Sequence, residues 1–152
     1  MIGGLVALKV DPNIMAKLAG ERMSVVVTGT NGKSTTTRMV ATALRTRYTV
    51  ATNDGGDNMD AGIVSALNRH LDAHTICLEV DEMHVPHVMD AISPTVLVLL
   101  NLSRDQLDRV GEINTIERRL RAAVTAHPDT IVVANCDDMM MASVAYDAQN
   151  VV

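Results

Sequence analysis

The segment between residues 23 and 47 constrains the fold most strongly. Residues 23–28 form an apolar, β-branched run typical of a buried strand, and apolar residues then recur at helical spacing as far as Arg47. A polar turn that contains Gly29 and Gly32 separates the two patterns. A strand that turns at once into a helix is the first half of a βαβ unit, so this segment predicts a parallel sheet with the turn at the carboxyl end of one strand.

The residue types in this turn are those that bind a polyphosphate. Gly29 and Gly32 allow backbone N–H groups to surround phosphate oxygens. Lys33 supplies a positive charge, and Ser34 offers a hydroxyl to a metal ion where a helix begins with unpaired N–H groups. The loop is shorter than the standard P-loop pattern, because Val27 stands where that pattern has its first glycine. The alternative is a simple turn that joins a buried strand to a capped helix.

Strands and helices alternate along the rest of the chain. Apolar runs predict strands at residues 48–52, 75–80, 95–100 and 130–134, the last two of them buried, and the start of another at 149–152. Helices are predicted at 12–20 (with Asp11 as N-cap and Pro12 first), 63–71, 83–92, 113–126 (with Glu117 facing water) and 138–145. This order predicts a single P-loop-containing α/β domain: a mostly parallel, doubly wound sheet with helices on both faces.

Composition excludes several classes of protein. The net charge of −5 and the near absence of aromatic residues argue against a nucleic-acid surface. No apolar run is long enough to span a membrane, and the N-terminus has neither the basic n-region nor the small-residue cleavage pattern expected of a signal peptide. Cys77 and Cys136 are interpreted as reduced thiols in or beside strands. A soluble cytoplasmic protein is expected.

Three carboxylates crowd the end of the strand predicted at 75–80. Glu79 and Asp81 fall on one face, where like charges repel unless they share a cation. We therefore expect a Mg²⁺ ion between Ser34 and Glu79, together with phosphates and water. Glu82 is interpreted as a solvated acid at a helix start.

Two further polar segments, 101–109 and 135–138, follow the next two strands, where ligands of parallel sheets bind. Each could also be a helix start with a cap or surface ion pairs. His84 and His87 flank Pro86 and are interpreted as surface or packing residues rather than metal ligands.

Five motifs, in this order and spacing, resemble the central ATP-binding domain of the Mur ligase superfamily, and its MurT-like branch in particular. They are TGTNGKSTTTRMV (28–40), GGDNM (55–59), LEVDE (78–82), NLSRDQLDRVGE (101–112) and NCDD (135–138). The pair LEVDE and RDQLDR is more particular to the superfamily than the phosphate loop. The resemblance covers the chain from Leu5 onward and implies one domain over residues 1–152.

The resemblance also implies roles for individual residues. Phosphate binding would fall to Gly29, Thr30, Asn31, Gly32, Lys33, Ser34 and Thr35. Lys33 and Glu79 would be catalytic, Ser34 and Glu79 would hold Mg²⁺, Asn58 would lie near the phosphate and substrate, and Asn135 and Asp138 would lie beside the adenine. The chain departs from the family at Asp57 (usually alanine), Ser103 (usually aromatic) and Met139 (usually proline), and Gln106 replaces a histidine that binds a second metal in most Mur ligases.

The implied activity is that of an ATP-dependent carbon–nitrogen ligase of peptidoglycan synthesis. It would phosphorylate the D-glutamate α-carboxylate of the lipid II stem peptide, and ammonia from a GatD-like glutamine amidotransferase would then give D-isoglutamine. Neither Cys77 nor Cys136 is expected to be a glutaminase nucleophile. MurT-like proteins continue into a zinc-ribbon insertion and a C-terminal domain, so zinc is expected only beyond these 152 residues.

Two alternatives stay open at this point. An amino-acid-adding Mur ligase or a folylpolyglutamate synthase shares the phosphate loop, although no lysine follows Lys33 here to become a carbamylated metal ligand. The chain could also be a nucleotide-binding or assembly module without activity by itself.

Overall fold

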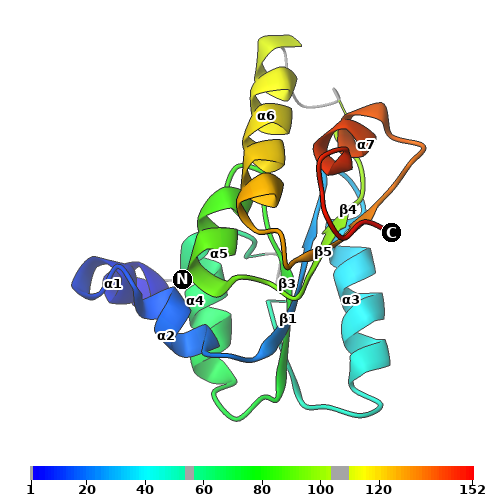
Figure 1. Cartoon of the computed structure of the whole chain (residues 1–152). Coiled ribbons are helices and arrows are strands. Elements are labelled where there is room, and N and C mark those ends of the chain that lie inside the picture. Colours follow the sequence, from blue (N-terminus) through cyan, green and yellow to red (C-terminus); the bar gives the residue numbers. More distant parts are fainter. Residues whose placement is uncertain (1, 54–56, 104–109) are drawn as a thin grey trace.

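A computed structural model describes residues 2–53, 57–103 and 110–152 (Figure 1). Its described strands form one sheet in the order β2-β3-β1-β4-β5, and every pair is parallel. The strands are β1 (Met23–Thr28), β2 (Val50–Thr52), β3 (Thr75–Glu79), β4 (Val96–Leu99) and β5 (Ile131–Ala134). The predicted α/β fold class is confirmed.

Helices lie on both faces of this sheet, but unequally. They are α1 (Ile2–Val10), α2 (Ile14–Ala19), α3 (Lys33–Leu44), α4 (Asp60–Arg69), α5 (Val85–Ile92), α6 (Val110–Ala126) and α7 (Met139–Ala145). In Figure 1, α3 stands on one side of the sheet, and α4, α5 and α6 stand on the other. Right-handed crossovers explain the difference, because only the connection through α3 moves toward the β2 edge and the later connections move back toward β5.

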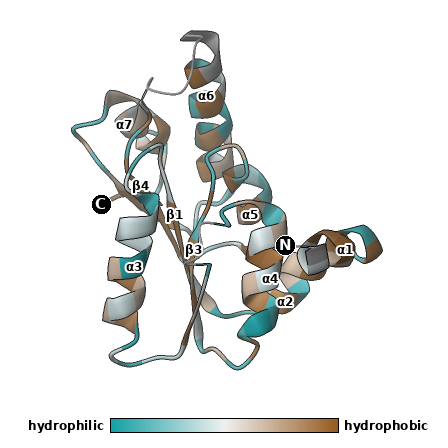
Figure 2. Cartoon of the chain, turned by 180° about the vertical axis from the view of Figure 1, so that it is seen from behind, coloured by the Kyte–Doolittle hydropathy of each residue, from teal (hydrophilic) through white to brown (hydrophobic). Residues whose placement is uncertain are grey.

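The core is aliphatic and divided by the sheet. On the α3 side, Val25, Val27 and Cys77 pack against Ala41. A larger cluster on the opposite face joins the central strands to the other helices, and Figure 2 shows the brown inner sides of those helices. β1 contributes to both clusters, which is why its sequence is apolar at consecutive positions rather than at alternate ones.

The N-terminal helix α1 was not predicted. Gly3 and Gly4 lower helix propensity, but Gly4 lets α1 lie directly on α4: a Cβ there would come within 2.0 Å of the Ala61 carbonyl oxygen. Tertiary contact therefore outweighs local propensity. None of the helices within the described ranges is long and apolar enough to cross a membrane.

Several element boundaries differ from the predictions. α2 starts at Ile14 instead of Pro12, because residues 12–13 form a turn. The Asp11 carboxylate still accepts from the Asn13 N–H, as an N-cap would, and it pairs with Lys17. β2 begins at Val50, and α4 ends before Leu71, which is exposed.

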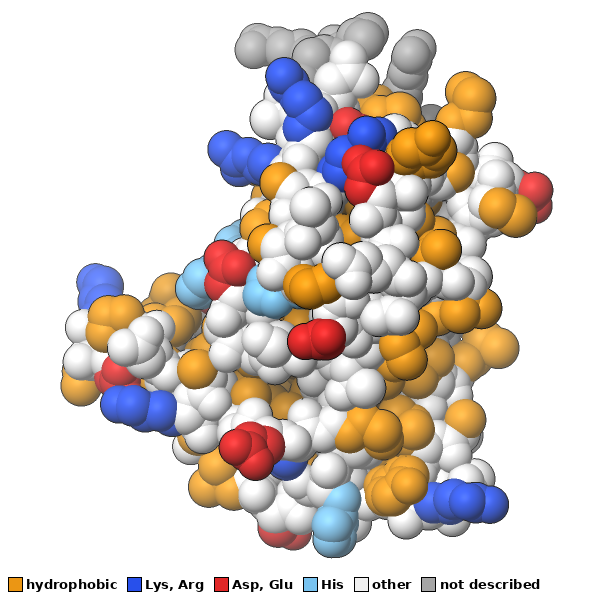
Figure 3. Space-filling view, in the orientation of Figure 1, with side chains coloured by type: hydrophobic (Ala, Val, Ile, Leu, Met, Phe, Trp, Pro, Cys, Tyr) orange, Lys and Arg blue, Asp and Glu red, His pale blue; other side chains and the backbone are white. Residues whose placement is uncertain are grey.

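Two predictions of burial were wrong. β5 was expected to be buried, but Ile131 and Val133 are exposed because α3 does not extend over that part of the sheet. Apolar side chains accordingly gather on the side of the surface that carries α3 and the C-terminus (Figure 3). Glu117 was expected to face water, but it is buried and accepts from Arg121 and Ser143. Val151 adds one parallel bridge to Val132, which confirms a strand start there.

Candidate functional site

A pocket of about 380 Å³ opens at the carboxyl ends of β1 and β3. The helices that follow these two neighbouring strands, α3 and α5, lie on opposite faces, which makes this edge a topological switch point where ligands bind. The described residues that line it are Thr30, Asn31, Gly32, Lys33, Ser34, Thr35, Asn58, Glu79 and Asp81. The structure thus brings together the loop, the carboxylate and the asparagine that lie far apart in the sequence.

The loop leaves the start of α3 open to an anion. Gly32 occupies the N-cap position with φ of 87°, and no side chain in the described part of the chain caps the helix. The first N–H groups of α3 therefore have no intrahelical partner and point toward the pocket, together with the positive end of the helix dipole. The positive φ of Gly32 and its lack of a Cβ atom both allow a phosphate to approach the backbone at this position.

Asn101, after β4, holds the loop in shape. Its Oδ1 accepts from the Asn31 N–H at 2.9 Å, and its Nδ2 donates to the Asn31 carbonyl at 2.9 Å. Its own carbonyl accepts from the Thr30 N–H at 2.8 Å. Gly29 makes this approach possible, because a Cβ there would lie 2.9 Å from the Asn101 nitrogen. The sequence indicated a site in the 101–109 segment but did not indicate this bracing role.

Lys33 lies inside the loop, and its ammonium group has hydrogen-bond and ion-pair partners within the protein. Its Nζ donates to the Gly29 carbonyl at 2.5 Å and to the Thr30 carbonyl at 3.3 Å, and it pairs with Glu82 Oε2 at 3.5 Å. Glu82 is 9% exposed, so its interpretation as a solvated helix-start acid was wrong. Its ion-pair partner, Lys33, is distant in the sequence, and only the fold brings the two side chains together.

Glu79 has the surroundings of a metal-binding carboxylate. It is 4% exposed, and among the described residues no cationic side chain pairs with it. Among the described residues its carboxylate accepts one side-chain hydrogen bond, from Asn58 Nδ2 at 3.4 Å from Oε1. A buried carboxylate without a cation is costly, and the Ser34 hydroxyl lines the same pocket. These residues fit Mg²⁺, which prefers a carboxylate, phosphate oxygens and waters.

Asn135 and Asp138 lie outside this pocket and are engaged with the backbone. The Asp138 carboxylate caps α7, accepting from the N–H groups of Met140 and Met141, and also accepts from Leu102 at 3.1 Å. Asn135 Nδ2 donates to the Leu100 carbonyl at 2.9 Å. Asp138 also lines a second pocket of about 310 Å³ with Leu102, Ile113, Asn114, Asp137, Met139 and Met140. Their place beside an adenine stays a prediction.

The remaining candidate residues have other surroundings. One carboxylate, that of Asp60, bonds both His84 Nδ1 at 3.0 Å and His87 Nδ1 at 2.8 Å. Burial raises the pKa of Cys77 to about 11, which makes it a poor nucleophile. Gln106 lies outside the described residues.

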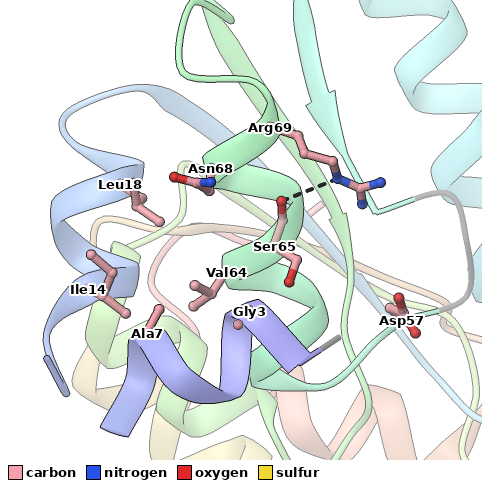
Figure 4. A pocket seen from close by; sticks show the side chains of 10 residues that line it. Gly3, Ala7, Ile14, Leu18, Asp57, Val64, Ser65, Asn68 and Arg69 are labelled. Carbon is pink, nitrogen blue, oxygen red and sulfur yellow. Dashed lines mark hydrogen bonds between the residues drawn. The ribbon is translucent and has the colours of Figure 1, made fainter. Parts of the chain in front are cut away.

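A separate cavity of about 420 Å³ lies between α1, α2 and α4 (Figure 4). Its walls are mainly apolar, and Ser65, Asn68 and Arg69 of α4 add polar groups. The Arg69 Nε donates to the Ser65 carbonyl at 3.3 Å. No residue of the phosphate loop lines this cavity, so it is distinct from the candidate site.

Comparison with known proteins agrees with this architecture. Residues 27–152 match the Mur ligase middle domain. The chain belongs to the Mur ligase family. The MurT subunit of lipid II isoglutaminyl synthase (glutamine-hydrolyzing) from Streptococcus pneumoniae is 38% identical over 139 residues, which are 88% of this chain and 31% of that protein. The same subunit from Staphylococcus aureus is 34% identical over 89% of this chain and 32% of its own length.

Other Mur ligases are also similar. A UDP-N-acetylmuramoylalanine–D-glutamate ligase from Nitrobacter hamburgensis is 36% identical over 77% of this chain and 25% of its own length. Among solved structures, MurF from Thermotoga maritima in complex with ADP has a TM-score of 0.72 and 25% identity, covering 91% of this chain and 35% of that one. MurF from Acinetobacter baumannii has a TM-score of 0.76 at 19% identity, covering 91% and 32%, and shows the fold alone. The chain spans about a quarter to a third of the length of these relatives.

Proposed function

We propose that this chain is the part of a larger ligase that binds Mg–ATP, with the nucleotide phosphates in the pocket between β1 and β3. One observation carries the proposal: the start of α3, the Lys33 ammonium and the buried Glu79 carboxylate, which pairs with no cation among the described residues, all line this pocket. An anion and a divalent cation together would satisfy these groups, and Mg–ATP provides both.

The side chains would divide the work of phosphoryl transfer between them. Bound Mg–ATP supplies the phosphoryl group and a divalent cation. Lys33 would leave Glu82 to neutralise the transferring phosphoryl group, while Ser34 and Glu79 would hold the metal ion. Asn58 would lie beside the phosphate and the incoming carboxylate. Such a site accelerates the reaction mainly by positioning and by neutralising charge.

For the whole protein we propose amidation of lipid II. The D-glutamate α-carboxylate of the stem peptide would be phosphorylated, and ammonia from a GatD-like glutaminase partner would displace the phosphate to give D-isoglutamine. The similarity to two MurT subunits supports this choice over an amino-acid-adding ligase. The nucleotide is cytoplasmic and lipid II is presented at the membrane surface, so we expect the protein to act in the cytoplasm beside that surface. The chain alone would bind nucleotide without completing the reaction.

The product of the full-length protein tests this proposal. Incubated with a glutaminase partner, ATP, glutamine and lipid II, it is expected to give lipid II with isoglutamine, detected by mass spectrometry of the stem peptide. The full-length Lys33→Ala variant is the control and should give no amidated product. A stem peptide extended by an amino acid would favour the alternative ligase, and an unchanged lipid II would contradict the proposal.

A further inference from the structure

Asn53 links the two segments that carry Glu79 and Asn58 in the candidate site, a role that the sequence patterns did not indicate. It follows β2 directly and is 1% exposed. Its Oδ1 accepts from the Glu79 N–H at 2.8 Å, and its Nδ2 donates to the Glu79 carbonyl at 2.7 Å. The same Nδ2 donates to the Asp57 carbonyl at 2.9 Å.

The hydrogen bonds of the Asn53 side chain continue the β2–β3 pairing beyond the point where backbone pairing stops. The β2–β3 ladder stops at the Thr52–Cys77 pair, so no β2 backbone group remains to hold Glu79. The Asn53 side chain occupies that place and bonds both backbone groups of Glu79. On the other side, the Val80 N–H donates to the Val27 carbonyl at 3.0 Å. The backbone that carries the Glu79 carboxylate is therefore fixed from both neighbouring strands.

The hydrogen bond from Asn53 Nδ2 to the Asp57 carbonyl links Asn53 to the segment that carries Asn58, another residue that lines the pocket. Asp57 immediately precedes Asn58, whose Nδ2 lies 3.4 Å from Glu79 Oε1. The Asn58 carbonyl accepts from the Asp81 N–H at 3.0 Å. One amide group thus fixes the spacing between the carboxylate and the asparagine that line the phosphate pocket.

We propose that Asn53 is a positioning residue that holds the Glu79 carboxylate in the geometry required by the metal ion of Mg–ATP. This inference rests on the proposed function. Only a primary amide of this length supplies one acceptor and two donors here. Aspartate would place a second oxygen against two carbonyl groups, and alanine would remove the partner of two buried backbone groups of Glu79 and of the partly buried Asp57 carbonyl. Residues that orient a metal ligand in this way strongly affect metal affinity.

The test measures how much Mg²⁺ tightens ATP binding to the chain, from calorimetric titrations with Mg²⁺ and with EDTA. The variants are Asn53→Ala and Asn53→Asp. Thr52→Val is the matched control, since its buried hydroxyl has no hydrogen-bond partner among the described residues and a methyl group can replace it. Thermal unfolding is followed for all variants, and the Asn53 variants should melt roughly 5–10 °C lower than the wild type.

We expect Mg²⁺ to tighten ATP binding at least about tenfold in the wild type and in Thr52→Val, and less than about threefold in both Asn53 variants. Affinity in EDTA should change less than about twofold, because the hydrogen bonds of the Asn53 side chain go to Glu79 and Asp57 and not to the phosphate loop, residues 29–35. A full Mg²⁺ effect in the Asn53 variants would overturn the inference, and so would loss of binding in EDTA, which would indicate a general structural role. If Lys33→Ala binds Mg–ATP as well as the wild type, the proposed function itself is wrong.

Discussion

Replacing Lys33 by alanine is expected to weaken Mg–ATP binding by about a hundredfold or more, which corresponds to about 2.7 kcal/mol. The ammonium is the one cation that lines the described phosphate pocket, and its bonds to two loop carbonyls hold it in place. A charge that contacts phosphate in a partly desolvated site contributes more than an exposed one. Isothermal titration calorimetry measures the change directly.

Lys17→Ala is the matched control for this substitution. Lys17 pairs with Asp11 on the surface at 2.6 Å, outside the pocket, so its loss should leave Mg–ATP affinity unchanged. Circular dichroism should show that both variants are folded. Equal affinity of Lys33→Ala and the wild type would disprove the assignment of the loop.

Gly29→Ala should damage both stability and binding. The φ of 142° at Gly29 is unfavourable for any side chain, and the new Cβ would lie 2.8 Å from the Leu100 Cβ and 2.9 Å from the Asn101 nitrogen. The loop would have to move off β4 and lose its bonds to Asn101. We expect a loss of about 2–4 kcal/mol in the free energy of unfolding, measured with urea, together with loss of Mg–ATP binding.

Gly3→Ala provides the comparison, because a Cβ at this helical position meets nothing within 4 Å. This substitution should stabilise α1 slightly, by about 0.5–1 kcal/mol, without affecting nucleotide binding. If Gly29→Ala were as stable as the wild type, the close contact between the phosphate loop and the Asn101 segment would be incorrect.

The sequence was sufficient for the fold class because the strongest signals are local. β1 is apolar at consecutive positions because it is buried on both faces, and α3 begins where the glycine loop ends. The burial of β5 could not be predicted in the same way. Its apolar run looks like that of a central strand, and its exposure depends on how far α3 extends over the sheet, which is a tertiary property.

The candidate site was predictable where a side chain contributes its own chemistry. Lys33 and Glu79 could be identified from residue type and position at strand ends. Glu82 could not, since a helix-start acid and the partner of a distant lysine look alike in sequence. Asn53 and Asn101 were also missed because each acts through backbone bonds to a segment far along the chain. These residues could not be identified because their partners are far away in the sequence, not because their side chains lack suitable functional groups.

The central claim is that nucleotide phosphates bind at the pocket between β1 and β3. It is tested most directly by following the backbone amide chemical shifts of the isotopically labelled chain during titration with ADP and Mg²⁺. We predict the largest shifts at residues 29–35, with further shifts at Asn58 and Glu79. Shifts confined to Gly3, Ser65 and Arg69, around the cavity between α1, α2 and α4, or no shifts at saturating nucleotide, would contradict the claim.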